Sequence, residues 1–341
     1  MTATVPPGGV PGRQVTVALQ TDKTPAAYAT LARAAEDLGF DGVSVFADLG
    51  FQPPALALAT IAAATSRVRI GAACQNPLLT HPVEIAGQVA ALALASQGRA
   101  YVGLARGAWL DGLGVDASRP LARLADSAEI VRRLLAGDDS GYDGAVLGLP
   151  AGVRLQFPLP PERVELLVGT WGERTTRWAG TTADEVKVGG SANPDMAALV
   201  RGWLGDGPTR VVLGAVTVCD TDRATARALA RREVALYLDV VAGLDPTVTV
   251  DPDVRERIGA AVAAGDHDAA GRAVPDDLLD RFAFAGTPED VAAQVEALFD
   301  AGADRVELGT PHGVDALEGL RLLGTRTLPR VRAAFGAGVG A

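Results

Sequence analysis

The chain has 341 residues, of which 48% are hydrophobic, so it is long enough for one large globular domain or two ordinary ones. Its formal net charge of −10 argues against nucleic acid and membrane surfaces as partners, because the long-range field repels both. Two cysteines cannot build a disulfide framework, and the three histidines lack the clustered spacing of a zinc site. We therefore expect no bound metal and a reducing, cytoplasmic setting.

The first 14 residues lack the apolar segment of a signal peptide and are predicted to form a flexible tail. From residue 15 the chain alternates short β-branched runs with longer helical patterns, which is typical of βα units and a parallel sheet. The first helix has Thr24 as its expected N-cap, Pro25 at its first position and Gly39 as its stop. Strands are predicted at 15–19, 42–46, 67–71, 100–104, 164–168, 185–188, 210–218 and 305–308. Helices are predicted at 25–38, 54–65, 82–97, 119–136, 173–180, 194–204, 222–241 and 288–301.

Eight parallel strands in a chain of this size fit an α/β fold of the (β/α)8 barrel type better than a doubly wound sheet. We expect a single barrel domain over residues 15–335, with insertions near 137–163 and 242–285. A barrel places its active site at the carboxyl ends of its strands, so the residues after each predicted strand are the candidates for function.

Polar residues and glycines follow most of the predicted strands, and as a set they favour a functional site over ordinary solvated loops. They are Gln20 and Asp22; Asp48; Ala73, Cys74, Gln75 and Asn76; Arg106, Gly107, Trp109 and Asp111; and the stretches 169–176, 189–194 and 309–313.

The stretch GTWGERTT (169–176) leads from a strand into a helix. The first turn of that helix offers backbone N–H groups and the positive end of the helix dipole, which suit a phosphate. Arg174 and Thr175 would add a guanidinium and a hydroxyl. The chain has no G-x-x-x-x-G-K-[ST] loop, no strand-borne G-x-G-x-x-G and no G-x-S-x-G elbow, which argues against nucleotide hydrolysis and serine esterase chemistry.

The run RIGAACQNPLLTHPVEIAGQVAALALASQGRAYVGLARGAWLDGLG (69–114) has an Asn-Pro after the third strand, a His-Pro opening the next helix and S-x-G-R before the fourth strand. In these features the chain resembles the luciferase-like superfamily of flavin and deazaflavin enzymes, and the resemblance extends from 31–45 to 282–308. The stretches GLARGAWLDGLG and GTPEDV are most similar to the methylene-tetrahydromethanopterin reductase group, whose members use the deazaflavin coenzyme F420. The resemblance implies a luciferase-like barrel and a homodimer.

The same resemblance implies roles for individual residues. A bulge with a cis non-proline peptide at Ala73–Cys74 would support the cofactor ring, and Cys74 would be a steric choice there, not a redox group. Trp109 and Gln20 would line the substrate pocket, although Trp109 also suits plain packing on the barrel rim. The expected cofactor-binding residues are Ala73, Cys74, Asn76, Arg106, Gly107, Gly169, Thr170, Trp171, Gly172, Arg174, Thr175 and Gly189.

Two departures from the family pattern bear on catalysis. The Asp-His pair that often follows the second strand is Ala47-Asp48 here, and the glutamate of related sugar-phosphate dehydrogenases is Ala108. The candidates for proton transfer are therefore Asp48 and Asp111. His81 is a weaker candidate for proton transfer, because its His-Pro pair is typical of the start of a helix.

The leading hypothesis is an oxidoreductase that transfers a hydride between coenzyme F420 and a small organic substrate. Arg106, Arg119 and Arg123 favour F420, whose tail carries more anions than FMN, although each also suits ordinary surface charge. An FMN-dependent monooxygenase is the first alternative. A catalytically silent flavin-binding barrel is the second, since the family histidine and glutamate are missing.

Overall fold

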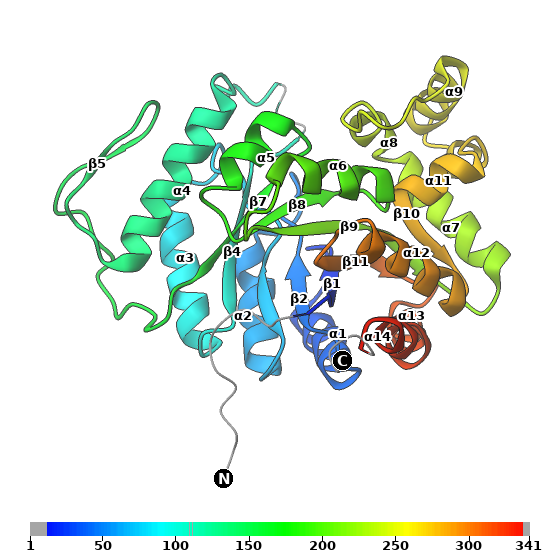
Figure 1. The fold of residues 1–341 in the computed structure, drawn as a ribbon, viewed down its shortest axis with the longest axis horizontal. Helices are drawn as coiled ribbons and strands as arrows, with labels where there is room; N and C mark the ends of the chain where they lie inside the picture. The colour runs from blue at the N-terminus through cyan, green and yellow to red at the C-terminus, as the bar shows by residue number, and fades with distance from the viewer. Residues whose placement is uncertain (1–11, 109, 111, 337–341) are drawn as a thin grey trace, which may run out of the picture.

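A computed structural model describes residues 12–108, 110 and 112–336 of the chain. These residues form a closed barrel of eight parallel strands surrounded by helices (Figure 1), which confirms the predicted (β/α)8 fold. The strands pair in the order β1-β2-β3-β4-β7-β8-β9-β11, and β11 pairs with β1 to close the barrel. They are β1 (Gln14–Leu19), β2 (Gly42–Val45), β3 (Arg69–Ala72), β4 (Ala100–Ala105), β7 (Glu165–Gly169), β8 (Glu185–Gly189), β9 (Arg210–Cys219) and β11 (Arg305–His312).

The helices begin where the sequence signals place them. Thr24 caps the first helix by accepting a hydrogen bond from the Ala27 N–H at 3.3 Å, as predicted. The predicted helix over 222–241 is instead two helices, because the backbone leaves the helical conformation at Tyr237. The helices are α1 (Pro25–Asp37), α2 (Pro54–Ala64), α3 (Pro82–Ala95), α4 (Pro120–Ala136), α5 (Glu173–Ala179), α6 (Pro194–Leu204), α7 (Arg223–Ala235), α8 (Leu238–Val241) and α12 (Pro288–Asp300). Beyond the predicted helices, α13 (Ala316–Leu322) and α14 (Leu328–Gly336) complete the ring.

One strand of the sheet, β10 (Ala283–Gly286), lies outside the predicted set. Its sequence AFAG has no β-branched residue, so it lacks the usual strand signal. The first half of β9 pairs with β8 as far as Gly189 and Gly214, and the second half pairs with β10 from Val216 onward. The long strand β9 therefore continues past the end of β8 with a different neighbour.

The two segments predicted as insertions contain additional elements. In the first, the buried Asp126 carboxylate of α4 accepts hydrogen bonds from the Val146 and Leu147 N–H groups and holds a small hairpin against the helix. In the second, two helices contact α7 at the right-hand side of the molecule and a third helix contacts one of them (Figure 1). These elements are β5 (Tyr142–Asp143), β6 (Gly148–Leu149), α9 (Pro252–Ala263), α10 (His267–Arg272) and α11 (Asp276–Phe282).

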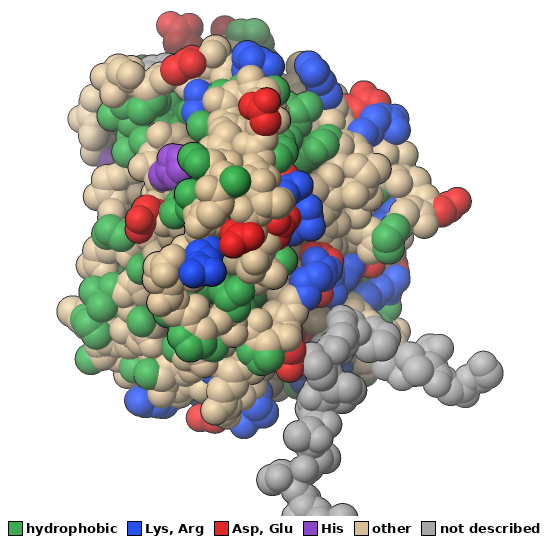
Figure 2. Space-filling view, turned by 90° about the vertical axis from the view of Figure 1, so that its left-hand side faces the viewer, with side chains coloured by type: hydrophobic (Ala, Val, Ile, Leu, Met, Phe, Trp, Pro, Cys, Tyr) green, Lys and Arg blue, Asp and Glu red, His purple; other side chains and the backbone are tan. Residues whose placement is uncertain are grey.

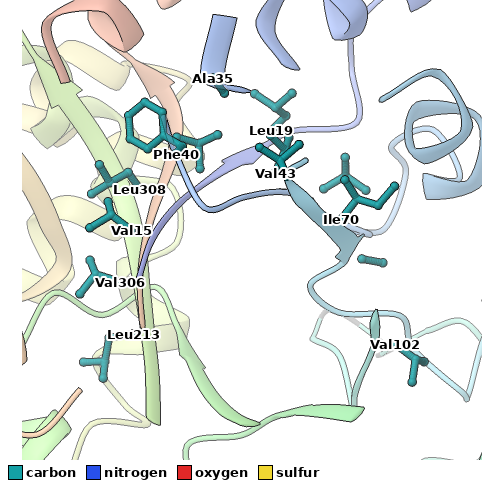
Figure 3. Close-up of a cluster of buried hydrophobic side chains, with 14 of the residues drawn as sticks. Val15, Leu19, Ala35, Phe40, Val43, Ile70, Val102, Leu213, Val306 and Leu308 are labelled. Carbon is teal, nitrogen blue, oxygen red and sulfur yellow. The ribbon is translucent and has the colours of Figure 1, made fainter. Parts of the chain in front are cut away.

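The main apolar core lies between the barrel strands and the surrounding helices. Figure 3 shows strand residues such as Val15, Val43 and Val306 in this layer, close to Phe40. Side chains alternate along a strand, so the neighbours of these residues point into the barrel. Ser44 and Glu307 are two of those neighbours, and they meet across the interior at 2.6 Å. The interior of the barrel is consequently polar, unlike the layer outside it.

Candidate active site

The end of β3 forms the bulge that the family resemblance implies. The peptide bond between Ala73 and Cys74 is cis, as predicted. Directly after it the chain rejoins β4: the Gln75 N–H donates to the Gly103 carbonyl at 2.8 Å, and the Ala105 N–H donates to the Gln75 carbonyl at 3.0 Å. The bulge is thus held in place from the neighbouring strand.

Glycines on β4 and β7 make room for the Cys74 side chain. A Cβ atom on Gly103 would lie 3.4 Å from the Cys74 Sγ, and one on Gly169 would lie only 2.9 Å from it. Burial raises the pKa of the Cys74 thiol to about 12, against an opposing effect of Lys187. The thiol is therefore neutral, and its surroundings suit the steric role expected for Cys74 better than a redox role.

Asn76 and Gly107 lie against each other at the ends of β3 and β4. The Asn76 side chain is buried, and its Oδ1 accepts a hydrogen bond from the Leu78 N–H at 2.8 Å. Gly107 has a φ of 79°, and a Cβ atom there would clash with Asn76 Nδ2. Arg106 is exposed beside them. Trp109 and Asp111, predicted for the substrate pocket and for proton transfer, lie outside the described residues.

The turn from β7 into α5 has an open helix start. The Gly172 N–H donates to Thr170 Oγ1 at 3.1 Å, and Gly172 is the N-cap, so no side chain caps α5. Arg174 is exposed on the first turn. The Thr176 hydroxyl is buried with no hydrogen-bond partner among the residues the structure describes. Of the other residues predicted here, Trp171 and Thr175 are half-buried and Gly189 is exposed at the end of β8.

Gln20 and Asp48 come together at the ends of β1 and β2, where the Gln20 amide donates to the carboxylate of Asp48. Both side chains are half-buried. The structure therefore joins a residue predicted for the substrate pocket with one predicted for proton transfer.

Two of the three arginines predicted for an anionic cofactor tail have contacts within the protein. Arg119 Nη1 donates to the Ala145 carbonyl at 2.8 Å, and Arg123 Nη2 lies 3.7 Å from a carboxylate oxygen of Asp116. A tail-binding role for either residue would compete with these contacts.

Within residues 12–108, 110 and 112–336, no three His, Cys, Asp or Glu side chains are placed together to hold a metal ion. None of the helices in that part of the chain is both long and apolar enough to span a bilayer.

The sequence analysis did not identify the charged groups beneath the bulge as part of the site. Lys187 on β8 forms a buried ion pair with Glu307 on β11, 120 positions away in the sequence. The only available signal was a charged residue inside each of two short strand patterns, EVKV and RVEL.

Comparison with known proteins finds relatives that match this chain over most of its length. The chain is 28% identical to the 5,10-methylenetetrahydromethanopterin reductase of Archaeoglobus fulgidus, over 87% of this chain and 93% of the relative. It is 27% identical to the same-named enzyme of Methanolobus tindarius, over 86% and 93% of the two chains.

Among solved structures, the coenzyme F420 dependent tetrahydromethanopterin reductase from Methanopyrus kandleri superposes with a TM-score of 0.85 at 23% identity, covering 94% of this chain and 99% of the other. An F420-dependent secondary alcohol dehydrogenase gives 0.76 at 20% identity, again covering 94% and 99%. These two structural similarities support the (β/α)8 barrel fold. The luciferase-like monooxygenase family model matches residues 8–305, so the chain belongs to this family and is a luciferase-like oxidoreductase.

Proposed function

We propose that the protein transfers a hydride between coenzyme F420 and a small organic substrate. The observation that carries the proposal is the cis-peptide bulge at Ala73–Cys74, closely packed against Gly103 and Gly169, in a chain whose full-length relatives are named 5,10-methylenetetrahydromethanopterin reductases. A planar ring needs a flat support, and these glycines leave the wall of the barrel without side chains beside the bulge.

The residues of the chain fit the cofactor at two further points. The uncapped first turn of α5, with Arg174 and Thr175, would hold a phosphate, because its N–H groups and the guanidinium are donors to an anion. Asn76 would meet the cofactor from the end of β3, where Gly107 allows β4 to pass close by. The bound coenzyme would supply the hydride chemistry, and the protein residues would fix its position.

Asp48 is our proposed proton-transfer group at the substrate. It lies at the end of β2, the position at which the family often has a histidine, and the Gln20 amide holds its carboxylate. Asp111 stays a second candidate for this role, and Trp109 a candidate wall of the substrate pocket.

An FMN-dependent monooxygenase is the second candidate function. A type II Baeyer-Villiger monooxygenase in complex with FMN shares the fold, with a TM-score of 0.66 at 14% identity. The proposed phosphate-binding residues do not distinguish the two cofactors, because both carry a ribityl phosphate.

Equilibrium titration of the purified protein with F420 and with FMN, at low and high salt, tests the assignment. We expect F420 to bind more tightly, and its affinity to fall more steeply with salt, because its longer anionic tail pairs with more cations in a protein of net charge −10. Tight FMN binding without measurable F420 binding would reverse the assignment in favour of the monooxygenase.

We also propose a cytoplasmic homodimer. Helices α2 and α3 contact each other, and each exposes a leucine, Leu56 at 56% and Leu94 at 38%. Figure 2 shows the side of the molecule that lies at the left of Figure 1, where hydrophobic side chains gather in several groups among scattered charges. Light scattering after size-exclusion chromatography should give twice the chain mass, and Leu56→Lys should shift it toward the monomer. A monomeric wild-type protein would contradict the dimer without affecting the cofactor assignment.

A further inference from the structure

The barrel interior contains charged side chains that the proposed catalytic steps do not use. We call them the interior ionic cluster: Arg69, Glu165, Glu185, Lys187, Arg210, Arg305 and Glu307. Glu185 lies between Arg305 Nη2 at 2.7 Å and Arg69 Nη1 at 2.9 Å. Burial alone would raise the pKa of Glu185, but Arg305, Arg69 and Arg210 outweigh it and hold the pKa at about 2. Glu185 therefore stays ionised, in a cluster of four basic side chains and three carboxylates.

The ion pair between Lys187 and Glu307 is the part of the cluster nearest the carboxyl ends of the strands. Each of the two residues lies two positions nearer the carboxyl end of its strand than another member of the cluster, Glu185 on β8 and Arg305 on β11. The two side chains are only 4% and 1% exposed. Glu307 has additional partners, since Ser44 Oγ donates to it at 2.6 Å and Arg305 Nη1 at 3.2 Å. The negative charge of Glu307 is thus shared among several donors.

Lys187 lies next to the Cys74 bulge because only a glycine separates them. Gly169 on β7 pairs with Lys187 on β8, and a Cβ atom on Gly169 would lie 2.9 Å from Cys74 Sγ. The Lys187 side chain reaches along β8 toward the carboxyl ends of the strands, since a Cβ atom on Gly189 would lie 3.9 Å from Lys187 Cε. The Lys187 ammonium also lies 5.4 Å from the centre of the Phe46 ring.

We propose that Lys187 acts electrostatically on the bound cofactor: its buried ammonium favours the reduced form of a cofactor ring bound on the Cys74 bulge. The inference rests on the proposed function. When the substrate gives up a hydride, the ring gains one proton and two electrons, and its charge becomes more negative by one. A fixed cation in a poorly solvated interior stabilises such a charge far better than one in water does.

The test compares Lys187→Met, which removes the charge but keeps a long side chain, with Lys187→Arg, which keeps the charge. The readouts are the midpoint potential of the bound cofactor and the dissociation constants of its oxidised and reduced forms. In Lys187→Met we expect the reduced form to lose about tenfold in affinity relative to the oxidised form, which for a two-electron couple is a midpoint potential lower by about 30 mV. Lys187→Arg should stay close to wild type.

Arg210→Met is the matched control, because it removes a cation of the same cluster at the opposite end of the strands, where Arg210 pairs with Glu165. Its midpoint potential should equal that of the wild type. A purely structural role for the cluster would instead show as a loss of unfolding free energy with no change in potential.

Lys187→Met leaves the buried Glu307 carboxylate without its ammonium partner, and this could prevent folding. The double variant Lys187→Met/Glu307→Gln removes both charges and serves as the alternative in that case. It should also have a lower potential than wild type, by less than the single variant. An unchanged potential in the folded variant overturns the role of Lys187 and leaves the proposed function intact. A wild-type protein that binds neither F420 nor FMN overturns both.

Discussion

The side-chain amide of Gln20 donates a hydrogen bond of 2.9 Å to Asp48 Oδ2 across the ends of β1 and β2. The orientation of this amide is fixed, because its Oε1 accepts the Thr21 N–H at 2.8 Å and only its NH2 group can face the carboxylate. The pair places an ionisable group at the carboxyl end of β2, where many family members have a histidine. This geometry supports Asp48 as the proposed proton-transfer group.

Asp48→Asn should lower turnover by about 10²-fold or more, because the amide keeps the size of the side chain but can no longer take up a proton. Cofactor affinity should stay at the wild-type value. Steady-state kinetics on an identified substrate, together with cofactor titration, separates the two effects. Asp111→Asn is the parallel variant for the second candidate. Wild-type turnover and pH profile in both variants would rule out a side-chain acid or base at these two positions.

Arg174→Ala should weaken cofactor binding by about 1.5–3 kcal/mol, and Thr175→Val by about 1 kcal/mol, because each removes a donor to the proposed phosphate. Arg177→Ala is the control, since Arg177 lies on the same short helix but forms an ion pair with Glu173. Calorimetric titration of the three variants measures the differences. Equal affinities in all three would place the phosphate elsewhere.

Gly169→Ala should weaken cofactor binding and lower the unfolding free energy by roughly 1–3 kcal/mol, because the added methyl group would lie 2.9 Å from Cys74 Sγ and 3.0 Å from the Ala105 Cβ. Cys74→Ala alone should keep activity, since the thiol is neutral. Adding Cys74→Ala to Gly169→Ala should recover part of the stability by removing one of the two clashes. Urea unfolding of the single and double variants measures this coupling, and an inactive Cys74→Ala variant would argue for a chemical role of the thiol.

His312 should make the protein less stable in mild acid. Burial lowers the pKa of His312 to about 4, whereas the unfolded chain binds a proton near pH 6.5. The unfolded state therefore takes up the proton first as the pH falls, and stability present above pH 6.5 is lost toward pH 4. The loss between pH 7.5 and pH 5 should be about 2 kcal/mol.

Urea unfolding at the two pH values measures the loss. His312→Asn is the matched variant, because His312 has a φ of 74° and asparagine tolerates such a backbone well. The variant should lose correspondingly less stability over this interval. An equal loss in both proteins would assign the acid sensitivity to other groups.

Local patterns in the sequence were sufficient to predict the eight barrel strands and most of the helices. The run VTVAL and the Thr24-Pro25 helix start carry signals within a few residues, so they could be predicted without knowing which distant strands pair with them. The strand AFAG was not predicted, because its residues carry no local strand signal and its conformation comes from pairing with β9. The position of the bulge at Cys74 was predicted from the family resemblance of the surrounding motif.

The tertiary structure determines which side chains come together at the site. Gln20 and Asp48 are 28 positions apart, and Lys187 and Glu307 are 120 apart. Hydrophobic periodicity predicts which face of a strand is buried, but it does not tell which charged side chains share the interior of a closed barrel. That depends on the register of every strand pair around the ring, including the pairing of β11 with β1 that closes it. The sequence by itself therefore determined the barrel and the strand ends that hold the candidate residues, whereas only the packing of β8 against β7 in the closed sheet brought Lys187 next to Cys74.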